Sequence, residues 1–332
     1  MTAAVLSDGG WGTALALTLL ENGHPVTLWG HFPDYIAEME RGRENRRFLP
    51  GVALPAGLRL TGDLAAAVAG ADLIVLAAPA QYARSLLQAL RPLRLSPEAL
   101  VVNVAKGIEM GSLLRMSELV RDLLAPRRYA ALSGPSHAEE VARRIPTAVV
   151  VAAADQVVAQ AVQAAFMNSV FRVYTTDDIV GVELGGALKN VLALAAGVCD
   201  GMGFGDNTKA ALMTRGIVEM ARLGSALGGR AETFNGLSGV GDLIVTCTSR
   251  HSRNRHVGEE LGRGGRLDEI IRSMGGQVAE GVTTAESAYR LARRAGVDTP
   301  IIAQVHASLY EGRDPRQAVR DLMTRDAKPE IP

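Results

Sequence analysis

Short apolar runs alternate with amphipathic segments of helical spacing through the first half of the chain. Near-continuous apolar runs of this length are typical of strands buried on both faces, as in a parallel sheet. Helical segments between such strands indicate βαβ units, which cross over right-handed. We therefore predict a Rossmann-like α/β fold with a doubly wound, mostly parallel sheet. Strands are expected at residues 3–6, 25–29, 71–79, 99–107, 129–132 and 148–152, and a helix at 13–21.

The pattern changes after residues 171–178, and from there we find helical periodicity and no convincing strand. We place a domain boundary near Asp178. It separates an α/β domain at 1–178 from an all-α domain at 179–332. Helices of the second domain are expected at 181–199, 207–226, 252–261, 283–295 and 300–310.

The composition is that of a globular protein with two domains: 332 residues, of which 48% are hydrophobic and 21% charged. Its 35 basic and 35 acidic residues give zero net charge, which argues against nucleic acid and favours a small-molecule partner. Cys199 and Cys247 have neither metal-ligand nor disulfide-framework spacing, so we expect no metal and a reducing cytoplasm. The N-terminus lacks a signal-type segment, and the longest apolar runs fall short of the ~20 residues of a membrane span. A cytoplasmic protein without a membrane span is therefore expected.

A glycine-rich segment, Ser7 to Gly12, follows the first strand and resembles the dinucleotide-binding motif G-x-G-x-x-G without its first glycine. Gly9 and Gly12 keep the second and third positions, and Ser7 replaces the first. Amides at the helix start, at Gly10 and Trp11, would bind the pyrophosphate. The alternative is an ordinary turn with incidental glycines. The position of the segment between a strand and a helix favours a cofactor site.

The end of the second strand, TLWGHF, lacks the acidic residue that usually holds the ribose 2′-hydroxyl of NAD. His31 stands in this region instead, and a partly charged imidazole would favour a 2′-phosphate. We therefore expect NADPH to be accepted, and a preference for NADPH is the stronger form of this hypothesis. The alternative is that Asp34 supplies the missing acid.

Two lysines are candidates for chemistry. Lys189 lies in an apolar helical stretch, where burial would lower its pKa toward that of a general base; the alternative is a lysine that reaches solvent at a helix end. Lys106 follows a buried strand, where open α/β sheets bind ligands, unless it is a surface lysine in a loop. Asp242, among three glycines, could pair with a lysine or merely form a turn.

Residues 249–256, SRHSRNRH, form the most basic cluster of the chain. Ser252 is a good N-cap, and Arg253 and Asn254 would lie in the first helical turn, which favours an anion such as phosphate. A solvated surface and a nucleic-acid patch are the alternatives. Gly134 and Ser136, at a strand-to-helix junction, could face the same crevice.

Together these segments resemble the NAD(P)-dependent sn-glycerol-3-phosphate dehydrogenases of the bacterial type over about residues 3–325. The resemblance is carried by WGTALA, LSGPSHAEEV, LGGALKNVLALAAGVCDGMGFGDN, MTRGIVEMARLG, GVGDLIVTCTSRHSRNRHVG and AEGVTTAES. It implies reversible reduction of dihydroxyacetone phosphate by NAD(P)H to sn-glycerol 3-phosphate, a precursor of phospholipids, and a homodimer. Ser7 departs from the family motif.

The resemblance also assigns residues. Lys189 takes the place of the general base, and Lys106 and Asp242 complete the catalytic set. Substrate-contacting positions are Lys106, Gly134, Ser136, Lys189, Asp242, Ser252, Arg253 and Asn254. Cofactor-contacting positions are Gly9, Gly10, Trp11, Gly12, His31, Lys106, Ala138, Arg253, Val278 and Glu280. Two other functions stay open: a β-hydroxyacid or 3-hydroxyacyl-CoA dehydrogenase, and a non-catalytic nucleotide-binding sensor.

Overall fold

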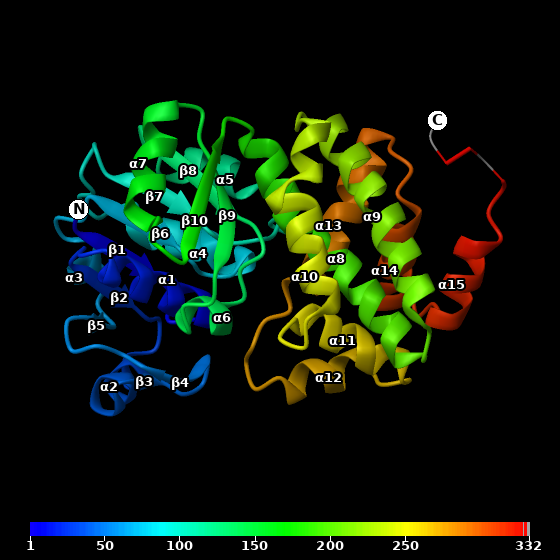
Figure 1. Ribbon diagram of the computed structural model, residues 1–332, viewed down its shortest axis with the longest axis horizontal. Coiled ribbons are helices and arrows are strands. Elements are labelled where there is room, and N and C mark those ends of the chain that lie inside the picture. Colours follow the sequence, from blue (N-terminus) through cyan, green and yellow to red (C-terminus); the bar gives the residue numbers. More distant parts are fainter. Residues whose placement is uncertain (328, 331–332) are drawn as a thin grey trace.

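A mixed sheet forms the centre of the N-terminal half in the computed structural model, which describes residues 1–327 and 329–330 (Figure 1). Its strands are β1 (Ala3–Leu6), β2 (Val26–Trp29), β5 (Arg59–Thr61), β6 (Leu73–Leu76), β7 (Leu100–Asn103), β8 (Arg128–Ser133), β9 (Thr147–Ala152) and β10 (Phe171–Thr176). The eight strands have the order β10-β9-β8-β7-β6-β1-β2-β5, and all neighbours pair in parallel except β8 with β9. The predicted, mostly parallel doubly wound sheet is confirmed. A separate hairpin is formed by β3 (Glu44–Asn45) and β4 (Leu49–Ala53).

Helices cover both faces of this sheet. Ala3 and Val5 of β1 belong to one buried cluster, and Ala4 and Leu6 belong to another, because successive strand residues point to opposite faces. The first cluster includes residues of α1 (Gly10–Glu21), α2 (Pro33–Gly42), α6 (Ala138–Ala142) and α7 (Gln156–Phe166). The second includes residues of α3 (Leu64–Val68), α4 (Ala80–Leu90) and α5 (Met116–Leu123). Burial on both faces explains why the strands are almost wholly apolar.

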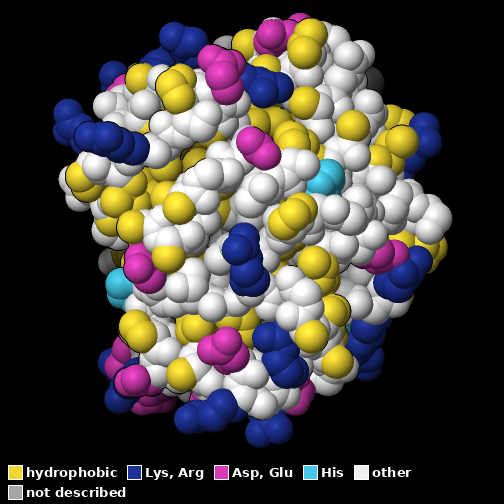
Figure 2. Space-filling model, turned by 90° about the vertical axis from the view of Figure 1, so that its left-hand side faces the viewer, with side chains coloured by type: hydrophobic (Ala, Val, Ile, Leu, Met, Phe, Trp, Pro, Cys, Tyr) yellow, Lys and Arg dark blue, Asp and Glu magenta, His cyan; other side chains and the backbone are white. Residues whose placement is uncertain are grey.

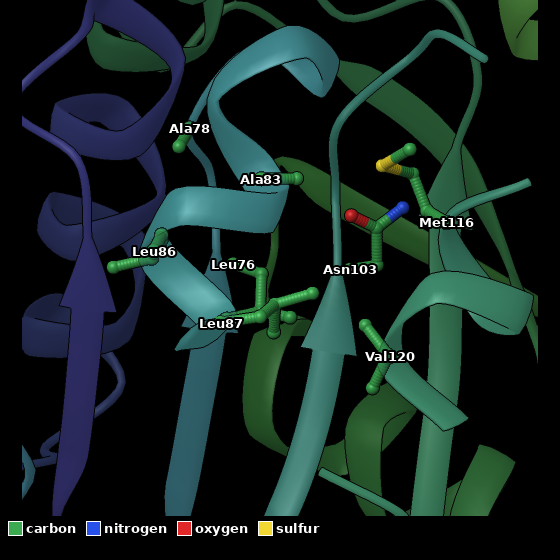
Figure 3. A pocket seen from close by; sticks show the side chains of 8 residues that line it. All are labelled: Leu76, Ala78, Ala83, Leu86, Leu87, Asn103, Met116 and Val120. Carbon is green, nitrogen blue, oxygen red and sulfur yellow. The ribbon is translucent and has the colours of Figure 1, made fainter. Parts of the chain in front are cut away.

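A small apolar pocket lies between the sheet and the helices α4 and α5 (Figure 3). The Asn103 side chain is polar, but its amide exchanges hydrogen bonds with the Ala105 backbone (3.2 and 3.3 Å). We therefore interpret the pocket as a packing space within the core. Its lining residues are Leu76, Ala78, Ala83, Leu86, Leu87, Asn103, Met116 and Val120.

The C-terminal half is helical, and α8 (Ile179–Gly201) is its central helix (Figure 1). The helix is long and apolar enough to cross a membrane, but 83% of its most apolar window is buried inside the protein, as in a core helix. The other helices are α9 (Asp206–Ala226), α10 (Asp242–Thr248), α11 (Arg253–Gly262), α12 (Leu267–Ser273), α13 (Glu280–Ala295), α14 (Pro300–Tyr310) and α15 (Pro315–Met323). A 3₁₀ helix at Ala231–Asn235 and a π-helical turn at Leu237–Gly241 precede α10.

The predicted helices of this half correspond to α8, α9, α11, α13 and α14. As predicted, no strand follows β10 within the described residues. The helices α10, α12 and α15 were not predicted, and the helix expected at 13–21 begins earlier, at Gly10. The strands expected at 71–79 and 99–107 are shorter, at Leu73–Leu76 and Leu100–Asn103, because the residues at their ends lie in loops.

We propose that residues 1–178 and 179–332 are separate domains. Asp178 caps α8, since its Oδ1 accepts a hydrogen bond from Gly181 N (2.8 Å). The two clusters that flank the sheet are distinct from the buried cluster around α8, which supports this division. Residues 328 and 331–332 of the second domain lie outside the described residues.

The face of the sheet-containing half shown in Figure 2 carries Lys and Arg side chains intermixed with Asp and Glu. This arrangement agrees with the zero net charge of the chain. A nucleic-acid binder would gather basic side chains into a stripe or patch. The expectation that the protein does not bind nucleic acid stays a prediction.

Candidate active site

The loop after β1 has the geometry of a phosphate-binding loop. The helix α1 begins at Gly10, and its N-cap, Gly9, offers no side-chain acceptor. The first turn of α1 contains no acidic residue, so its amides remain available to an anion. A β-carbon on Gly12 would lie 2.3 Å from the Ser7 carbonyl oxygen, and one on Gly10 would lie 2.5 Å from that of Phe48. These glycines allow the close approach that the motif requires, and the site fits a dinucleotide pyrophosphate.

Ser7 replaces the first motif glycine and keeps the backbone conformation that a glycine would favour. Its φ is +152°. Its Oγ accepts a hydrogen bond from Gly9 N (3.2 Å), which fixes the turn. The serine therefore supports the loop at the cost of backbone strain.

The end of β2 presents His31 to solvent. The imidazole lies edge-on to the rings of Trp29 (6.0 Å between centroids) and Phe32 (4.9 Å). Asp34, also exposed, lies in the first turn of α2. Both side chains are free to contact a ligand at this edge of the sheet.

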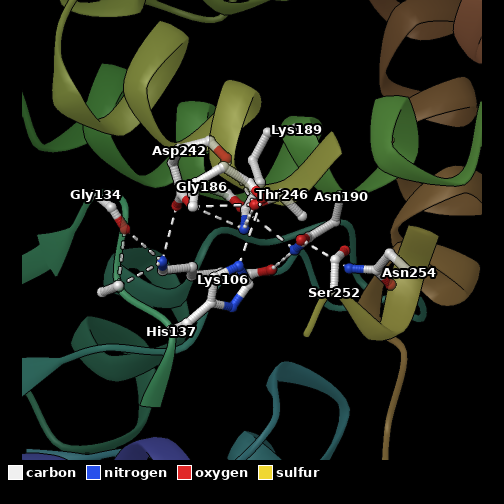
Figure 4. Close-up of polar contacts among 12 residues, drawn as sticks. Lys106, Gly134, His137, Gly186, Lys189, Asn190, Asp242, Thr246, Ser252 and Asn254 are labelled. Carbon is white, nitrogen blue, oxygen red and sulfur yellow. Dashed lines mark hydrogen bonds and ion pairs between the residues drawn. The ribbon is translucent and has the colours of Figure 1, made fainter. Parts of the chain in front are cut away.

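Three charged side chains from separate elements meet in the crevice (Figure 4). Lys106 follows β7, Lys189 lies in α8, and Asp242 begins α10. Lys106 Nζ is 2.8 Å from Asp242 Oδ2, and Lys189 Nζ is 2.9 Å from Asp242 Oδ1. Lys189 is 6% exposed and Asp242 is 1% exposed. One buried carboxylate therefore holds two ammonium groups, one on each oxygen.

Burial lowers the pKa of Lys189 from 10.5 to about 8, although the negative charge of Asp242 opposes this change. The positive charge of Lys106 lowers it further. Burial alone would raise the pKa of Asp242, but the two lysine charges outweigh it and hold that pKa below its usual value. Lys189 thus loses a proton much more easily than an ordinary lysine, while Asp242 stays ionised.

Glycines in α8 allow this helix to lie close to the end of the sheet. A β-carbon on Gly186 would lie 2.6 Å from Ser133 Oγ and 3.5 Å from Lys106 Cγ. Asn190, one residue after Lys189, donates a hydrogen bond to the Lys106 carbonyl oxygen (2.8 Å). The two lysines are therefore positioned by the same helix-to-loop contact.

The strand-to-helix junction after β8 contributes to the same site. Lys106 Nζ donates hydrogen bonds to the Gly134 carbonyl oxygen (2.8 Å) and to Ser136 Oγ (3.0 Å). Ala138 begins α6, and a β-carbon on Gly10 would lie 3.4 Å from its Cβ. The predicted substrate positions of this segment thus meet Lys106, and its predicted cofactor position meets the phosphate loop.

The basic cluster contributes the start of α11. Ser252 is the N-cap, as predicted, and its Oγ accepts a hydrogen bond from Arg255 N (3.2 Å). Arg253 is the first residue of the helix and is exposed. Asn254 is buried. Its side-chain Nδ2 donates a hydrogen bond to Asn190 Oδ1 (2.8 Å), and its Oδ1 accepts one from Gly281 N (2.9 Å). Asn254 thus connects the start of α11 to the lysine site.

The start of α13 lies against the N-terminal half. Glu280 Oε1 accepts a hydrogen bond from Ala80 N (2.8 Å) at the start of α4. A β-carbon on Gly107 would lie 3.4 Å from the same oxygen, so Glu280 also lies next to the loop of Lys106. Val278, two residues earlier, is half-buried.

Comparison with known proteins identifies the family of the chain. Two family models match, described as the N-terminus and the C-terminus of NAD-dependent glycerol-3-phosphate dehydrogenase, over residues 2–159 and 178–320. The chain belongs to the NAD-dependent glycerol-3-phosphate dehydrogenase family. It is therefore related to oxidoreductases that use a nicotinamide cofactor.

Individual members of the glycerol-3-phosphate dehydrogenase family match the chain from end to end. The enzyme named glycerol-3-phosphate dehydrogenase [NAD(P)+] of Geobacter metallireducens is 54% identical over 98% of both chains. That of Pelodictyon phaeoclathratiforme is 51% identical over 99% of both. The crystal structure of glycerol-3-phosphate dehydrogenase from Coxiella burnetii is 39% identical, has a TM-score of 0.93, and is matched over 99% of its chain by 98% of this one.

Some side chains at the candidate site of this chain were not predicted from its sequence. Lys189 Nζ donates a hydrogen bond to Thr246 Oγ1 (2.6 Å), and Thr246 lies one helical turn after Asp242. His137 lies nearby, and burial, together with the charge of Lys189, lowers its pKa. The i, i+4 spacing of Asp242 and Thr246 would have been a signal if α10 had been predicted.

Proposed function

We propose that this chain catalyses the reversible reduction of dihydroxyacetone phosphate to sn-glycerol 3-phosphate with NAD(P)H. The observation that carries the proposal is the buried bridge from Lys106 through Asp242 to Lys189. It lies where the loops after β7 and β8 meet α8, at the carboxyl ends of the strands, where open α/β sheets bind their ligands.

Lys189 is the general acid and base of this mechanism. A nicotinamide bound at this site would supply or accept the hydride at C2 of the substrate. In the reductive direction the Lys189 ammonium donates a proton to the C2 oxygen as negative charge develops there. In the oxidative direction its neutral amine removes the proton of the C2 hydroxyl. A pKa of about 8 lets one amine serve both directions near neutral pH.

Asp242 orients both lysines and keeps their charges together in a site that is nearly closed to solvent. Thr246 Oγ1 accepts the second hydrogen bond of Lys189, which leaves one N–H of the ammonium for the substrate. Lys106, held by Gly134 and Ser136, stabilises negative charge on the substrate.

The substrate phosphate binds at the start of α11. Helix N-terminal amides and an arginine suit a dianion, and Ser252 and Arg253 provide both. Asn254 positions this end of the helix against α8. The loop before α1 and the residues around Lys106 would hold the nicotinamide dinucleotide. Its proposed contacts are Gly9, Gly10, Trp11, Gly12, His31, Lys106, Ala138, Arg253, Val278 and Glu280.

A turnover assay with dihydroxyacetone phosphate and each reduced cofactor tests this function, through the loss of nicotinamide absorbance. Lys189→Ala is expected to lower kcat by at least about 10²-fold while the Kd for the cofactor changes little. Lys209→Ala is the matched control, because Lys209 pairs with Asp200 rather than with Asp242. Normal cofactor binding without turnover of any triose phosphate would instead support a nucleotide sensor.

We also propose that the enzyme is a cytoplasmic homodimer that supplies glycerol phosphate for phospholipid synthesis. The family membership supports this context, and the free thiols of Cys199 and Cys247 suit a reducing compartment. Light scattering after size-exclusion chromatography tests the dimer. A monomer at micromolar concentration would contradict it.

A further inference from the structure

The position that normally carries the ribose-binding acid is occupied by a glycine in this chain. Gly30 follows directly after β2, at the end of the strand that dinucleotide-binding domains use for that acid. A β-carbon on Gly30 would lie 2.4 Å from Ile36 Cδ1 and 2.9 Å from Asp8 Cγ. Residue 30 therefore has little room for a side chain, because the Ile36 side chain and the carboxyl group of Asp8 already occupy this space.

Asp8 reaches this space from the phosphate-binding loop, where it stands between Ser7 and Gly9. It is 7% exposed, and its Oδ2 is buried without a hydrogen-bond partner among the described residues. Its backbone is held firmly, because Asn45 Nδ2 donates a hydrogen bond to the Asp8 carbonyl oxygen (2.6 Å). The backbone of Asp8 is thus held in place, while Oδ2 of its side chain has no hydrogen-bond partner among the described residues.

An unpartnered carboxylate oxygen is costly inside a protein unless a ligand completes its hydrogen bonding. Burial raises the pKa of Asp8, while the positive charges of Arg47 and His31 act in the opposite direction. His31 lies just after β2, and Arg47 lies in the turn of the β3–β4 hairpin, so both basic side chains come from segments outside the core. The environment of Asp8 is therefore that of a polar ligand site rather than of a closed core.

We propose that Asp8 is the specificity-determining residue for the cofactor: its carboxylate accepts a hydrogen bond from the adenosine ribose 2′-hydroxyl, in place of the acid missing after β2. The inference rests on the proposed function, because it concerns the same dinucleotide site. The acid comes from the first loop of the motif instead of from the second strand, and it reaches the same end of the sheet.

This assignment reverses the preference expected from the end of β2 alone. A carboxylate at the 2′ position repels a phosphate there, since like charges at close range disfavour binding strongly. The protein should therefore bind NADH more tightly than NADPH, although His31 is nearby. Asp34, the alternative acid, is exposed in the first turn of α2 and has no role in this selection.

Calorimetric binding of ADP-ribose and 2′-phospho-ADP-ribose to the cofactor-free full chain at pH ~8 tests the proposal without any turnover. The wild type is expected to bind ADP-ribose at least about tenfold more tightly than its 2′-phosphate. Asp8→Asn, which keeps the shape of the side chain, should reduce this ratio by at least about tenfold. Asp34→Asn, the matched control, should change it by less than about twofold.

Equal or tighter binding of the 2′-phosphate by the wild type would overturn the proposal, whether or not the variants fold. An unchanged ratio in Asp8→Asn, or in Asp8→Ala if the first variant loses its native circular dichroism, would also overturn it. Failure of the wild type to bind either ligand would overturn the dinucleotide site, and with it the proposed function. Binding of both ligands with the wrong ratio would overturn the role of Asp8 alone.

Discussion

Gly197 of α8 lies so close to Arg255 of α11 that a β-carbon on the glycine would be 1.9 Å from the Arg255 carbonyl oxygen. The contact is reciprocal, since a β-carbon on Gly258 of α11 would be 2.0 Å from the Leu194 carbonyl oxygen. The two helices therefore pack backbone against backbone. This contact fixes the start of α11, and with it Arg253, relative to the helix that carries Lys189.

Gly197→Ala is expected to lower the free energy of unfolding by about 3 kcal/mol or more, because the helix backbones must move apart. Gly205→Ala is the matched control, since a β-carbon at Gly205 meets no atom within 4 Å. Thermal unfolding followed by circular dichroism measures both. Similar melting temperatures for the two variants would contradict the close packing.

The lowered pKa of Lys189 predicts opposite pH profiles for the two directions of the reaction. Reduction requires the ammonium form, so its kcat/KM should fall as the pH rises through about 8. Oxidation requires the neutral amine, so its kcat/KM should rise to a plateau above about 8.

The amine of Lys189 also links the stability of the protein to pH. Its folded pKa lies below the unfolded value, so the unfolded chain binds more protons between about pH 8 and 10.5. The contribution of Lys189 to stability should therefore increase with pH over this interval.

Initial rates in both directions test the predicted pH profiles, with Lys189→Ala as the control, since the residual activity of this variant should lack the inflection. Parallel profiles in the two directions would exclude Lys189 as the proton donor.

A buried glutamate joins α8 to the sheet. Glu183 pairs with Arg115 (2.9 Å) and accepts hydrogen bonds from Ser117 N and Tyr129 OH (2.8 Å each). Glu183→Ala would leave the arginine and the tyrosine without this partner, and we expect a loss of about 3–5 kcal/mol.

Glu98→Ala is the control for this change, because Glu98 forms an exposed pair with Arg127 and should cost less than about 1 kcal/mol. Chemical denaturation at neutral pH measures both. A loss below about 1 kcal/mol in Glu183→Ala would show that the buried pair is replaceable by water.

Ser7→Gly tests the departure from the dinucleotide motif. Glycine relieves the strain of a positive φ, worth about 1–3 kcal/mol, but removes the hydrogen bond from Gly9 N, worth about 1 kcal/mol. The Kd for the cofactor should stay within about tenfold, or ~1.4 kcal/mol.

Ser7→Ala is the comparison, since it keeps the strain and loses the bond, and it should be the less stable of the two. Calorimetric binding and melting temperatures measure these effects. A gain in affinity well above tenfold in Ser7→Gly would show that the native loop binds the cofactor poorly.

The apolar pattern was sufficient to predict the central helix and six of the eight strands of the sheet, but it did not predict β5 and β10. Strand β6 and helix α8 are buried almost throughout, so their apolar sequences are easy to recognise, although the strand expected at 71–79 was longer than β6. The helix α10 was missed because three glycines before Asp242 are typical of a loop. In the structure they form a π-helical turn that leads directly into the helix.

The charged residues of the site were predicted better than their neighbours. A lysine just before Asn190 and the eight apolar residues that follow it, as at Lys189, is conspicuous in the sequence. Thr246 and Asn190 are not, because ordinary polar residues gain a role at this site only through tertiary contacts. The proximity of Asp8 to Gly30 depends on the pairing of β1 with β2, which places the ends of both strands side by side.

Helix α8 carries both Glu183 and Lys189, six residues and therefore about 9 Å apart along one rigid rod. Because the glutamate is anchored to the sheet, the amine cannot swing away from the nicotinamide edge without first breaking that anchor. We therefore expect the position of Lys189 relative to the sheet to change little when the substrate binds. The amine of Lys189 is therefore already positioned relative to the sheet before a ligand binds.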